Sequence, residues 1–246
     1  MTERILYQFP ISHYCEKSRW QLDYKGLAYR TRNLLPGPHR LRTQWMARIN
    51  TLPVLRDGQR VVGDSTKIAY YLEKHYPERS LIPTDAESRA RVIELEQQLD
   101  RVAVHVRRWL YGQIIDRPEV MDAMLDPYRL PSPVRKVLAP VTREGVRRLY
   151  RIEPKAVAHS GQRLEEGLEL VEQTLRRGNG RYLVGERLTL ADITAAGLLA
   201  PLVSPGGTPW DMFEEGSLPA ALRKQLDDLR TRPAGQWVLE RYAEDR

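Results

Sequence analysis

Cysteine and long apolar runs are scarce in this chain of 246 residues. Its one cysteine, Cys15, cannot form an internal disulfide, so nothing requires an oxidising compartment and a cytoplasmic location is expected. No run approaches the roughly 18 apolar residues that a membrane-spanning helix needs. The first residues, MTERILYQF, lack the basic, apolar and small-residue order of a secretory signal. A soluble protein without membrane contacts is therefore expected.

Motifs for several kinds of catalytic site are also missing. The five histidines are scattered, without a His-Glu-x-x-His segment or a cysteine pair, so no metal site is expected. The sequence has no phosphate-binding glycine motif and no Ser-His-Asp nucleophile elbow. Chemistry that depends on a metal, a cradled phosphate or a serine triad is therefore not indicated.

The net charge of +7 is concentrated in the first third of the chain. Residues 1–78 hold 13 Lys+Arg against 7 Asp+Glu, whereas the remaining 168 residues hold 26 against 25. A basic chain raises the question of nucleic-acid binding, but there is no zinc-finger spacing, RNA-binding aromatic motif or basic tail. Nucleic-acid binding is not expected, and a small anionic ligand held by the first third would suit the same distribution.

The first 78 residues mix strand and helix signals. Strands are predicted at RILYQF and at YRTRNLL (29–35), separated by a helix from about Cys15 to Lys25. A further helix is predicted over 41–49. Asp57-Gly58 lies between two apolar pairs, which predicts a tight hairpin turn with φ above zero. Ser65 is the predicted N-cap of the next helix, so the order β-α-β-(α)-β-β-α forms a small α/β unit.

Beyond Arg79 the strand signals vanish and helical periodicity replaces them. Apolar residues recur at three- and four-residue steps, as one buried helix face requires: Val92, Leu95, Leu99, Val102, Val106 and Leu110, then Leu164, Leu168, Val171 and Leu175. Thr189 and Asp192 have the spacing of a capping box at the start of another helix. We expect a domain over 1–78, a linker over 79–87 and an all-helical domain over 88–246, in which 113–155 is the least readable stretch.

Four polar features of the first 78 residues belong together. Ser12 lies where a strand-end loop meets a helix N-terminus, a place that stabilises anions. Leu52-Pro53 precedes a strand in a way that suits a cis-proline turn. Asp64-Ser65 lies at another helix N-terminus, where Ser65 can hold a carboxylate and Asp64 an ammonium group. Three basic side chains after the second strand are available for a further carboxylate: His39, Arg40 and Arg42.

Four segments in the right order resemble the cytosolic glutathione transferases: FPISHYCEKSR, TLPVL, GDSTKIAYYLEKHYP and YLVGERLTLADI. The resemblance covers nearly the whole chain. It implies an α/β thioredoxin-like N-terminal domain followed by an all-α helical bundle. It also implies glutathione as co-substrate, a small hydrophobic electrophile held mainly by the second domain, a role in detoxification and a homodimer.

The resemblance also assigns roles residue by residue. Ser12 matches the serine or cysteine that faces the glutathione sulfur, and the backbone of Leu52, before Pro53, matches the partner of the cysteinyl part. Asp64 and Ser65 match the acidic-serine pair that holds the γ-glutamyl end. The glycine end has no clear partner, because the usual Asn-Pro-x-Gly-Lys run is missing before Leu52; His39 and Arg42 are candidates, together with Arg40.

Other reactions and structural roles stay open at this point. Glutathione-dependent isomerisation, peroxide reduction and thiol-disulfide exchange through Cys15 are alternatives, as is a non-catalytic ligand-binding or regulatory protein. We favour a packed structural thiol for Cys15 and core packing for Tyr7. We expect His13 to be a solvated loop residue, and a position at the entrance of the site is the alternative. Three aromatic residues are candidates for the acceptor pocket or for the core: Trp109, Tyr111 and Tyr128. The segment GGTPWDMF (206–213) is a further candidate for the pocket.

Overall fold

Four short strands near the N-terminus form one mixed sheet in the computed structural model, which describes residues 3–178, 180–211 and 218–246. They are β1 (Arg4–Gln8), β2 (Arg30–Asn33), β3 (Val54–Asp57) and β4 (Arg60–Gly63), in the spatial order β2-β1-β3-β4. β2 runs parallel to β1, whereas β3 and β4 form an antiparallel hairpin paired with β1 through β3. Gly58 has φ = +60° in the hairpin turn, as the Asp57-Gly58 pattern predicted.

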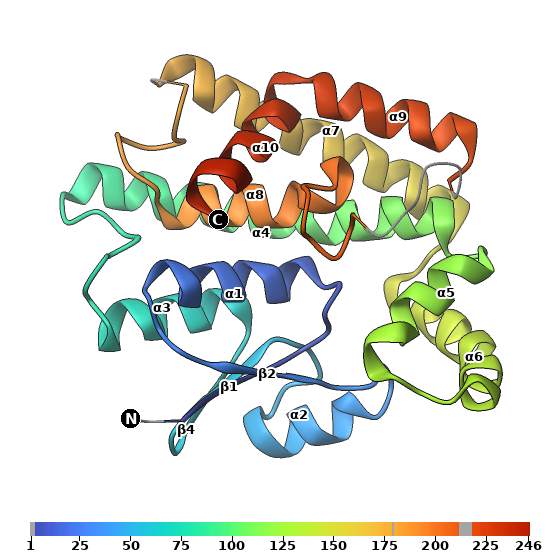
Figure 1. The fold of residues 1–246 in the computed structure, drawn as a ribbon. Helices are drawn as coiled ribbons and strands as arrows, with labels where there is room; N and C mark the ends of the chain where they lie inside the picture. The colour runs from blue at the N-terminus through green and yellow to red at the C-terminus, as the bar shows by residue number, and fades with distance from the viewer. Residues whose placement is uncertain (1–2, 179, 212–217) are drawn as a thin grey trace.

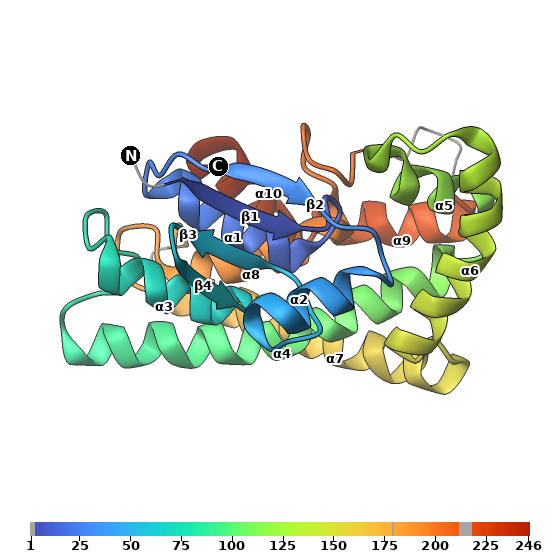
Figure 2. The ribbon, with the colours of Figure 1, turned by 90° about the horizontal axis from the view of Figure 1, so that it is seen from below.

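Three helices pack on the two faces of this sheet. α1 (His13–Tyr24) and α3 (Ser65–His75) cover one face, and α2 (His39–Ala47) lies against the other (Figures 1 and 2). The predicted order of elements is confirmed, but the predicted N-cap of α3 was wrong. The carboxylate of Asp64, and not Ser65, accepts the N–H groups of Thr66 and Lys67, at 3.1 and 3.0 Å. A carboxylate one residue earlier can reach both free N–H groups of the first turn.

Every element described after β4 is a helix, as the loss of strand signals predicted. The set is α3, then α4 (Ala86–Ile114), α5 (Pro118–Leu125), η1 (Asp126–Tyr128), α6 (Ser132–Tyr150), α7 (Pro154–Arg177), α8 (Leu190–Val203), α9 (Ala220–Thr231) and α10 (Pro233–Asp245). The stretch that was least readable from sequence contains α5, η1 and α6. A thioredoxin-like unit followed by a helical unit is therefore the fold. None of the helices that the structure describes is long and apolar enough to cross a membrane.

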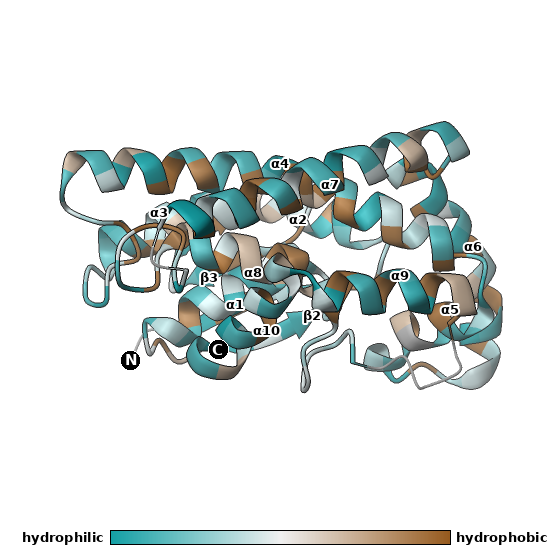
Figure 3. Ribbon diagram, turned by 90° about the horizontal axis from the view of Figure 1, so that it is seen from above, coloured by the Kyte–Doolittle hydropathy of each residue, from teal (hydrophilic) through white to brown (hydrophobic). Residues whose placement is uncertain are grey.

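α8 is the centre of the helical part, and all of its residues are buried. It contacts α1 on one side and α4 and α10 on others. Hydrophobic residues on α4 and α7 alternate with hydrophilic ones along each helix (Figure 3), and the predicted apolar faces of both helices are buried. The predicted capping box also forms: the backbone N–H of Thr189 donates to the Asp192 carboxylate at 2.8 Å, and the Thr189 side chain accepts the backbone N–H of Asp192. The Thr189 hydroxyl also donates to that carboxylate at 2.6 Å.

A buried charged cluster joins the two parts of the chain. The ammonium group of Lys17 on α1 lies 2.6 Å from Glu96 and 3.0 Å from Asp100, both on α4. It also donates to the hydroxyl of Thr66 on α3 at 3.0 Å. Burial of Asp100 raises the pKa of its carboxyl, although Lys17 opposes that shift. This cluster holds three helices together next to Asp64 and fixes the first part against the second.

Candidate active site

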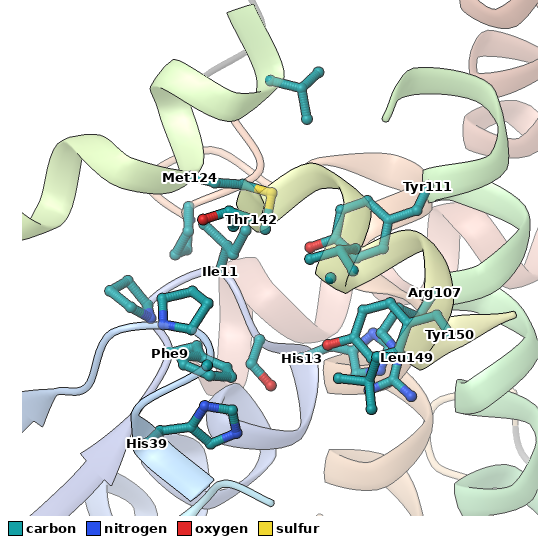
Figure 4. Close-up of a pocket in the computed structure, with 18 of the residues that line it drawn as sticks. Phe9, Ile11, His13, His39, Arg107, Tyr111, Met124, Thr142, Leu149 and Tyr150 are labelled. Carbon is teal, nitrogen blue, oxygen red and sulfur yellow. The ribbon is translucent and has the colours of Figure 1, made fainter. Parts of the chain in front are cut away.

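A cavity of about 380 Å³ lies where the end of the sheet meets α4, α5 and α6 (Figure 4). Residues 9–13 and 36–40 and parts of 107–114 and 138–150 supply most of its wall. The remaining lining residues are Val120, Met124, Tyr128, Pro201, Pro209 and Trp210. Most of these side chains are aliphatic or aromatic. Such a cavity, mainly apolar with a few polar groups at its border, is the usual form of a small-molecule site.

Ser12 borders this cavity and is the N-cap of α1. Its backbone is extended, with φ = −83° and ψ = 122°, and its carbonyl oxygen accepts the N–H of Glu16 at 2.9 Å. The Ser12 hydroxyl oxygen accepts the N–H of Cys15 at 3.4 Å. The oxygen acts as acceptor in the cap, and the hydroxyl keeps one hydrogen that it can donate. The side chain thus combines a donor with the positive end of a helix dipole.

Cys15 faces away from the cavity into the core. Its side chain is fully buried in a cluster with Tyr7, Leu52 and Val54. Burial raises the pKa of the Cys15 thiol, although Arg19 and Ser12 oppose the shift. The thiol is therefore protonated near neutral pH and packs as a small apolar group. Tyr7 also packs in the core, as expected.

The other residues expected to hold glutathione lie at one end of the hairpin of β3 and β4, where Val54 pairs with Gly63. The Leu52-Pro53 peptide bond is cis, and Pro53 accepts the N–H of Asp64 at 3.1 Å. Asp64 has φ = +81°, a region that side-chain-bearing residues rarely adopt and that recurs at functional sites. Ser65 follows it and is almost fully buried. Of the predicted glutathione residues, only Ser12 and two candidates for the glycine end, His39 and Arg40, line the cavity itself.

The three basic candidates for the glycine end separate into different positions. His39 is the first residue of α2 and is buried, with 4.7 Å between the centroids of its ring and that of Phe9. Burial lowers the pKa of its imidazole. Arg40 is exposed at the border of the cavity. Arg42 lies over the ring of Tyr7, with 5.5 Å between its guanidinium carbon and the ring centroid. The structure therefore brings His39 and Arg40 to the cavity and leaves Arg42 outside its wall.

Sequence reasoning missed a polar group on the α4 side of the cavity. Arg107 lies over the ring of Tyr150, 3.8 Å from its centroid. His13 was expected to be solvated, which was wrong, because it is the first residue of α1 and only 4% exposed. Burial and then the charge of Arg107 hold the pKa of His13 well below its ordinary value. The sequence held one signal for this group: Arg107 directly follows Val106, a residue of the predicted apolar helix face.

Aromatic residues close the cavity, and two of them also connect the two parts of the chain. Tyr111 and Tyr128 line the cavity, whereas Trp109 packs into the neighbouring cores. The Tyr128 hydroxyl donates to the carbonyl of Leu34 at 2.8 Å. In the segment 206–213, Trp210 donates to the carbonyl of Ile11 at 3.2 Å. Met212 and Phe213 of that segment lie outside the described residues.

Two family models match the chain, one for each part. The model "Glutathione S-transferase, N-terminal domain" matches residues 6–80, and "Glutathione S-transferase, C-terminal domain" matches residues 154–230. Together they cover more than half of the chain.

Individual relatives agree with these matches. Glutathione S-transferase 1 of Dianthus caryophyllus is 38% identical over 90 residues, which are 35% of this chain and 40% of that protein. The chain thus spans less than half the length of that relative. Protein LigF of Sphingobium sp. is 27% identical over 229 residues, covering 88% of this chain and 85% of LigF.

Solved structures show the same fold. The crystal structure of the β-etherase LigF from Sphingobium sp. has a TM-score of 0.61 at 24% identity, covering 97% of this chain and 99% of LigF. A glutathione S-transferase from Methylobacterium radiotolerans, solved in complex with glutathione sulfonate, has a TM-score of 0.59 at 20% identity, covering 97% and 95%. The domain matches, with this fold, show that the chain belongs to the glutathione S-transferase family.

Proposed function

We propose that the protein transfers glutathione to small electrophiles and that Ser12 stabilises the reacting thiolate. The observation that carries this proposal is the position of the Ser12 hydroxyl, at the N-terminus of α1 and at the border of the cavity. A thiol with a pKa of about 8.5 is only a few per cent ionised at pH 7. Lowering that pKa by two units requires about 2.7 kcal/mol in favour of the anion.

The site offers stabilisation of this size without a metal or a strong base. A hydrogen bond from a hydroxyl to a charged group contributes about 1.5–3 kcal/mol, and a helix N-terminus adds about 0.3–1 kcal/mol. The thiol proton leaves to solvent, the sulfur forms a bond to an electrophilic carbon, and the bond from that carbon to its leaving group breaks. The protein contributes ionisation and orientation.

The end of the hairpin of β3 and β4 that carries Leu52 and Asp64 suits the rest of glutathione. Among the hydrogen bonds between described residues, none uses the backbone N–H or C=O of Leu52, so both are free to pair with the cysteinyl part of the tripeptide. Asp64 uses only Oδ1 in capping α3, which leaves Oδ2 for the γ-glutamyl ammonium group. Ser65 and the α3 N-terminus suit the carboxylate of that end. His39 remains a candidate for the glycine end, as does Arg42.

This assignment gives the two parts of the chain different tasks. Residues 1–78 would bind glutathione, 79–87 would link the parts, and 88–246 would supply most of the acceptor pocket. The cavity wall supports this division only in part, because residues 9–13 and 36–40 of the first part also contribute to it. A homodimer is part of the proposal and can be tested by mass measurement in solution.

Ether cleavage is the second candidate reaction, because LigF, a β-etherase, matches this chain over most of both lengths. It needs the same thiolate, with an aryloxide or alkoxide as the leaving group. Thiol-disulfide exchange through Cys15 is less favoured, since that thiol is buried and its pKa is raised.

Replacement of Ser12 tests the proposal directly. Ser12→Ala should keep glutathione binding, measured by thermal shift, and should lose most of the conjugation rate with 1-chloro-2,4-dinitrobenzene. Ser12→Thr keeps both the hydroxyl and the capping oxygen, so it should retain much more activity than the alanine variant. An unchanged rate in Ser12→Ala would show that another group stabilises the thiolate. A lack of any thermal shift at millimolar glutathione would instead favour a non-catalytic protein of this fold.

A further inference from the structure

The charged side chains in the cavity wall are two arginines, Arg40 and Arg107. His13 and His39 also line the cavity, and no aspartate or glutamate does so among the described residues. Arg40 is exposed to solvent and lies on the first part of the chain, beside the proposed glutathione site. Arg107 lies on α4, on the opposite side of the cavity, among apolar and aromatic neighbours. The two arginines are therefore separate features, and Arg107 requires its own explanation.

Arg107 has no anionic partner in the part of the chain that the structure describes. Its Nε is buried and makes no hydrogen bond, and none of the described salt bridges includes it. Its guanidinium carbon lies 3.8 Å from the ring centroid of Tyr150 and 5.8 Å from that of Tyr14. Aromatic faces attract a cation, but they do not replace hydrogen-bond acceptors for its N–H groups. A guanidinium beside an apolar wall can therefore bind an oxygen ligand that the described residues do not supply.

His13 provides a second, independent observation at the same place. It is 4% exposed, lines the cavity, and its Nε2 is buried without a hydrogen-bond partner. A buried polar nitrogen without a partner costs free energy, and such groups in a native fold call for an explanation. His13 and Arg107 line the same cavity, and both lie near the ring of Tyr14: the centroids of the His13 and Tyr14 rings are 4.7 Å apart, and the guanidinium carbon of Arg107 is 5.8 Å from the Tyr14 centroid. One ligand group can therefore satisfy both.

The remainder of the cavity suits an aromatic ring. Tyr111 and Tyr150 stack with their ring centroids 5.8 Å apart and lie with Arg107 on the α4 and α6 side of the cavity (Figure 4). Leu110 and Met124 extend the apolar wall. A flat apolar body with one anionic end would contact the rings and leave its anion beside the guanidinium.

We propose that the acceptor substrate is an aromatic electrophile with a carboxylate group, and that Arg107 binds this carboxylate with His13 as a second contact. The proposal rests on the proposed glutathione transfer and names its substrate class. Arg107 is a specificity residue in this scheme, because it holds a group remote from the sulfur and takes no part in breaking bonds. A carboxylate matches the planar guanidinium with two parallel hydrogen bonds, which an uncharged amide cannot reproduce.

Binding of a matched pair of unreactive compounds tests this idea without any need for catalysis. We suggest calorimetric titration of the full chain with 3-nitrobenzoate and 3-nitrobenzamide, which differ only in the anionic group. The wild type should bind the acid at least tenfold more tightly than the amide. Arg107→Gln should lose that preference and keep its affinity for the amide, whereas Arg107→Lys should keep part of the preference. Arg101→Gln is the matched control, because it removes an exposed arginine from the same helix.

A second pair of compounds connects the binding result to turnover. For 4-chloro-3-nitrobenzoate and the corresponding amide, Arg107→Gln should lower kcat/KM for the acid roughly tenfold or more and change that for the amide much less. Equal binding of acid and amide by the wild type would overturn the proposal. So would an Arg107→Gln variant that loses glutathione affinity while keeping the preference for the acid, because the arginine would then serve glutathione. If conjugation fails with every electrophile while the preference in binding persists, only the proposed reaction is wrong.

Discussion

The backbone N–H of Cys15 donates to the hydroxyl oxygen of Ser12 at 3.4 Å. The same serine is thus the N-cap of α1 and borders the cavity. The helix turns Cys15 toward the core, where it contacts the residues that precede and begin β3. The spacing Ser-x-x-Cys therefore places a hydroxyl at the site and a thiol behind it, which is consistent with chemistry on the thiol of the ligand and not on that of the protein.

The reactivity of Cys15 is the first prediction. Because the thiol is fully buried and its pKa is raised, iodoacetamide should label the native protein very slowly at pH 8. The same protein in denaturing urea should be labelled completely, which serves as the control, and mass spectrometry measures both. Rapid labelling of the native state would mean that the thiol is exposed and ionised, and would reopen the redox alternative.

Asp64 should be required for glutathione affinity beyond its role as a helix cap. Asp64→Ala removes a cap, which costs about 1 kcal/mol, and also removes the carboxylate proposed to hold the ammonium group. The dissociation constant for glutathione should rise roughly tenfold or more, since hydrogen bonds to charged groups contribute about 1.5–3 kcal/mol. Calorimetry gives the affinity, and chemical denaturation gives the stability.

Asp85 offers the control for this experiment. It caps α4 in the same manner, accepting the N–H of Ser88 at 2.8 Å, and it lies outside the proposed site. Asp85→Ala should therefore reduce stability by a similar amount and leave glutathione affinity unchanged. If both variants bind glutathione as well as the wild type does, Asp64 acts only as a cap.

The buried cluster around Lys17 predicts a large loss of stability on substitution. Lys17→Met leaves Glu96 buried without its cation, and breaking such a pair costs about 3–5 kcal/mol. Lys67→Met, on the exposed side of α3, should change the free energy of unfolding by less than about 0.5 kcal/mol. The double variant Lys17→Met with Glu96→Leu should recover part of the loss. If Lys17→Met and the double variant were equally stable, the uncompensated charge of Glu96 would not be the cause of the lost stability.

Asp192 predicts a dependence of stability on pH. Burial raises the pKa of its carboxyl from 3.8 to about 6 in the folded chain. The folded state therefore binds this proton more tightly than the unfolded state, so the contribution to stability is complete below pH 4 and is lost as the pH rises through 6.

Comparison with Asp192→Asn isolates that contribution. The difference in unfolding free energy, wild type minus variant, should fall by on the order of 3 kcal/mol between pH 4 and pH 7. Urea denaturation at several pH values measures it. A difference that stays constant, or that grows with pH, would show that the hydrogen bonds from Thr189 and Leu183 outweigh burial.

Local signals in the sequence were enough for most elements. Short runs of β-forming residues and helical patterns located the strands and helices, and Asp57-Gly58 located the hairpin turn, because these depend on interactions between residues close in the chain. The N-cap of α3 was missed by one residue, since Asp64 and Ser65 are both good capping residues and the backbone conformation decided between them. The elements of 113–155 were not recognised, because their burial depends on partners from distant segments.

The sequence by itself determined the thioredoxin-like and helical parts, the family, and the candidate residues Ser12, Asp64 and Ser65, all of which belong to short motifs. Only the tertiary structure decided that Arg107 and His13 face one cavity and that Cys15 does not. The physical reason is that a helix N-terminus or a cap is made by neighbours in the chain, whereas a cavity wall is made by segments about a hundred residues apart. Its charge and shape are known only after those segments have packed.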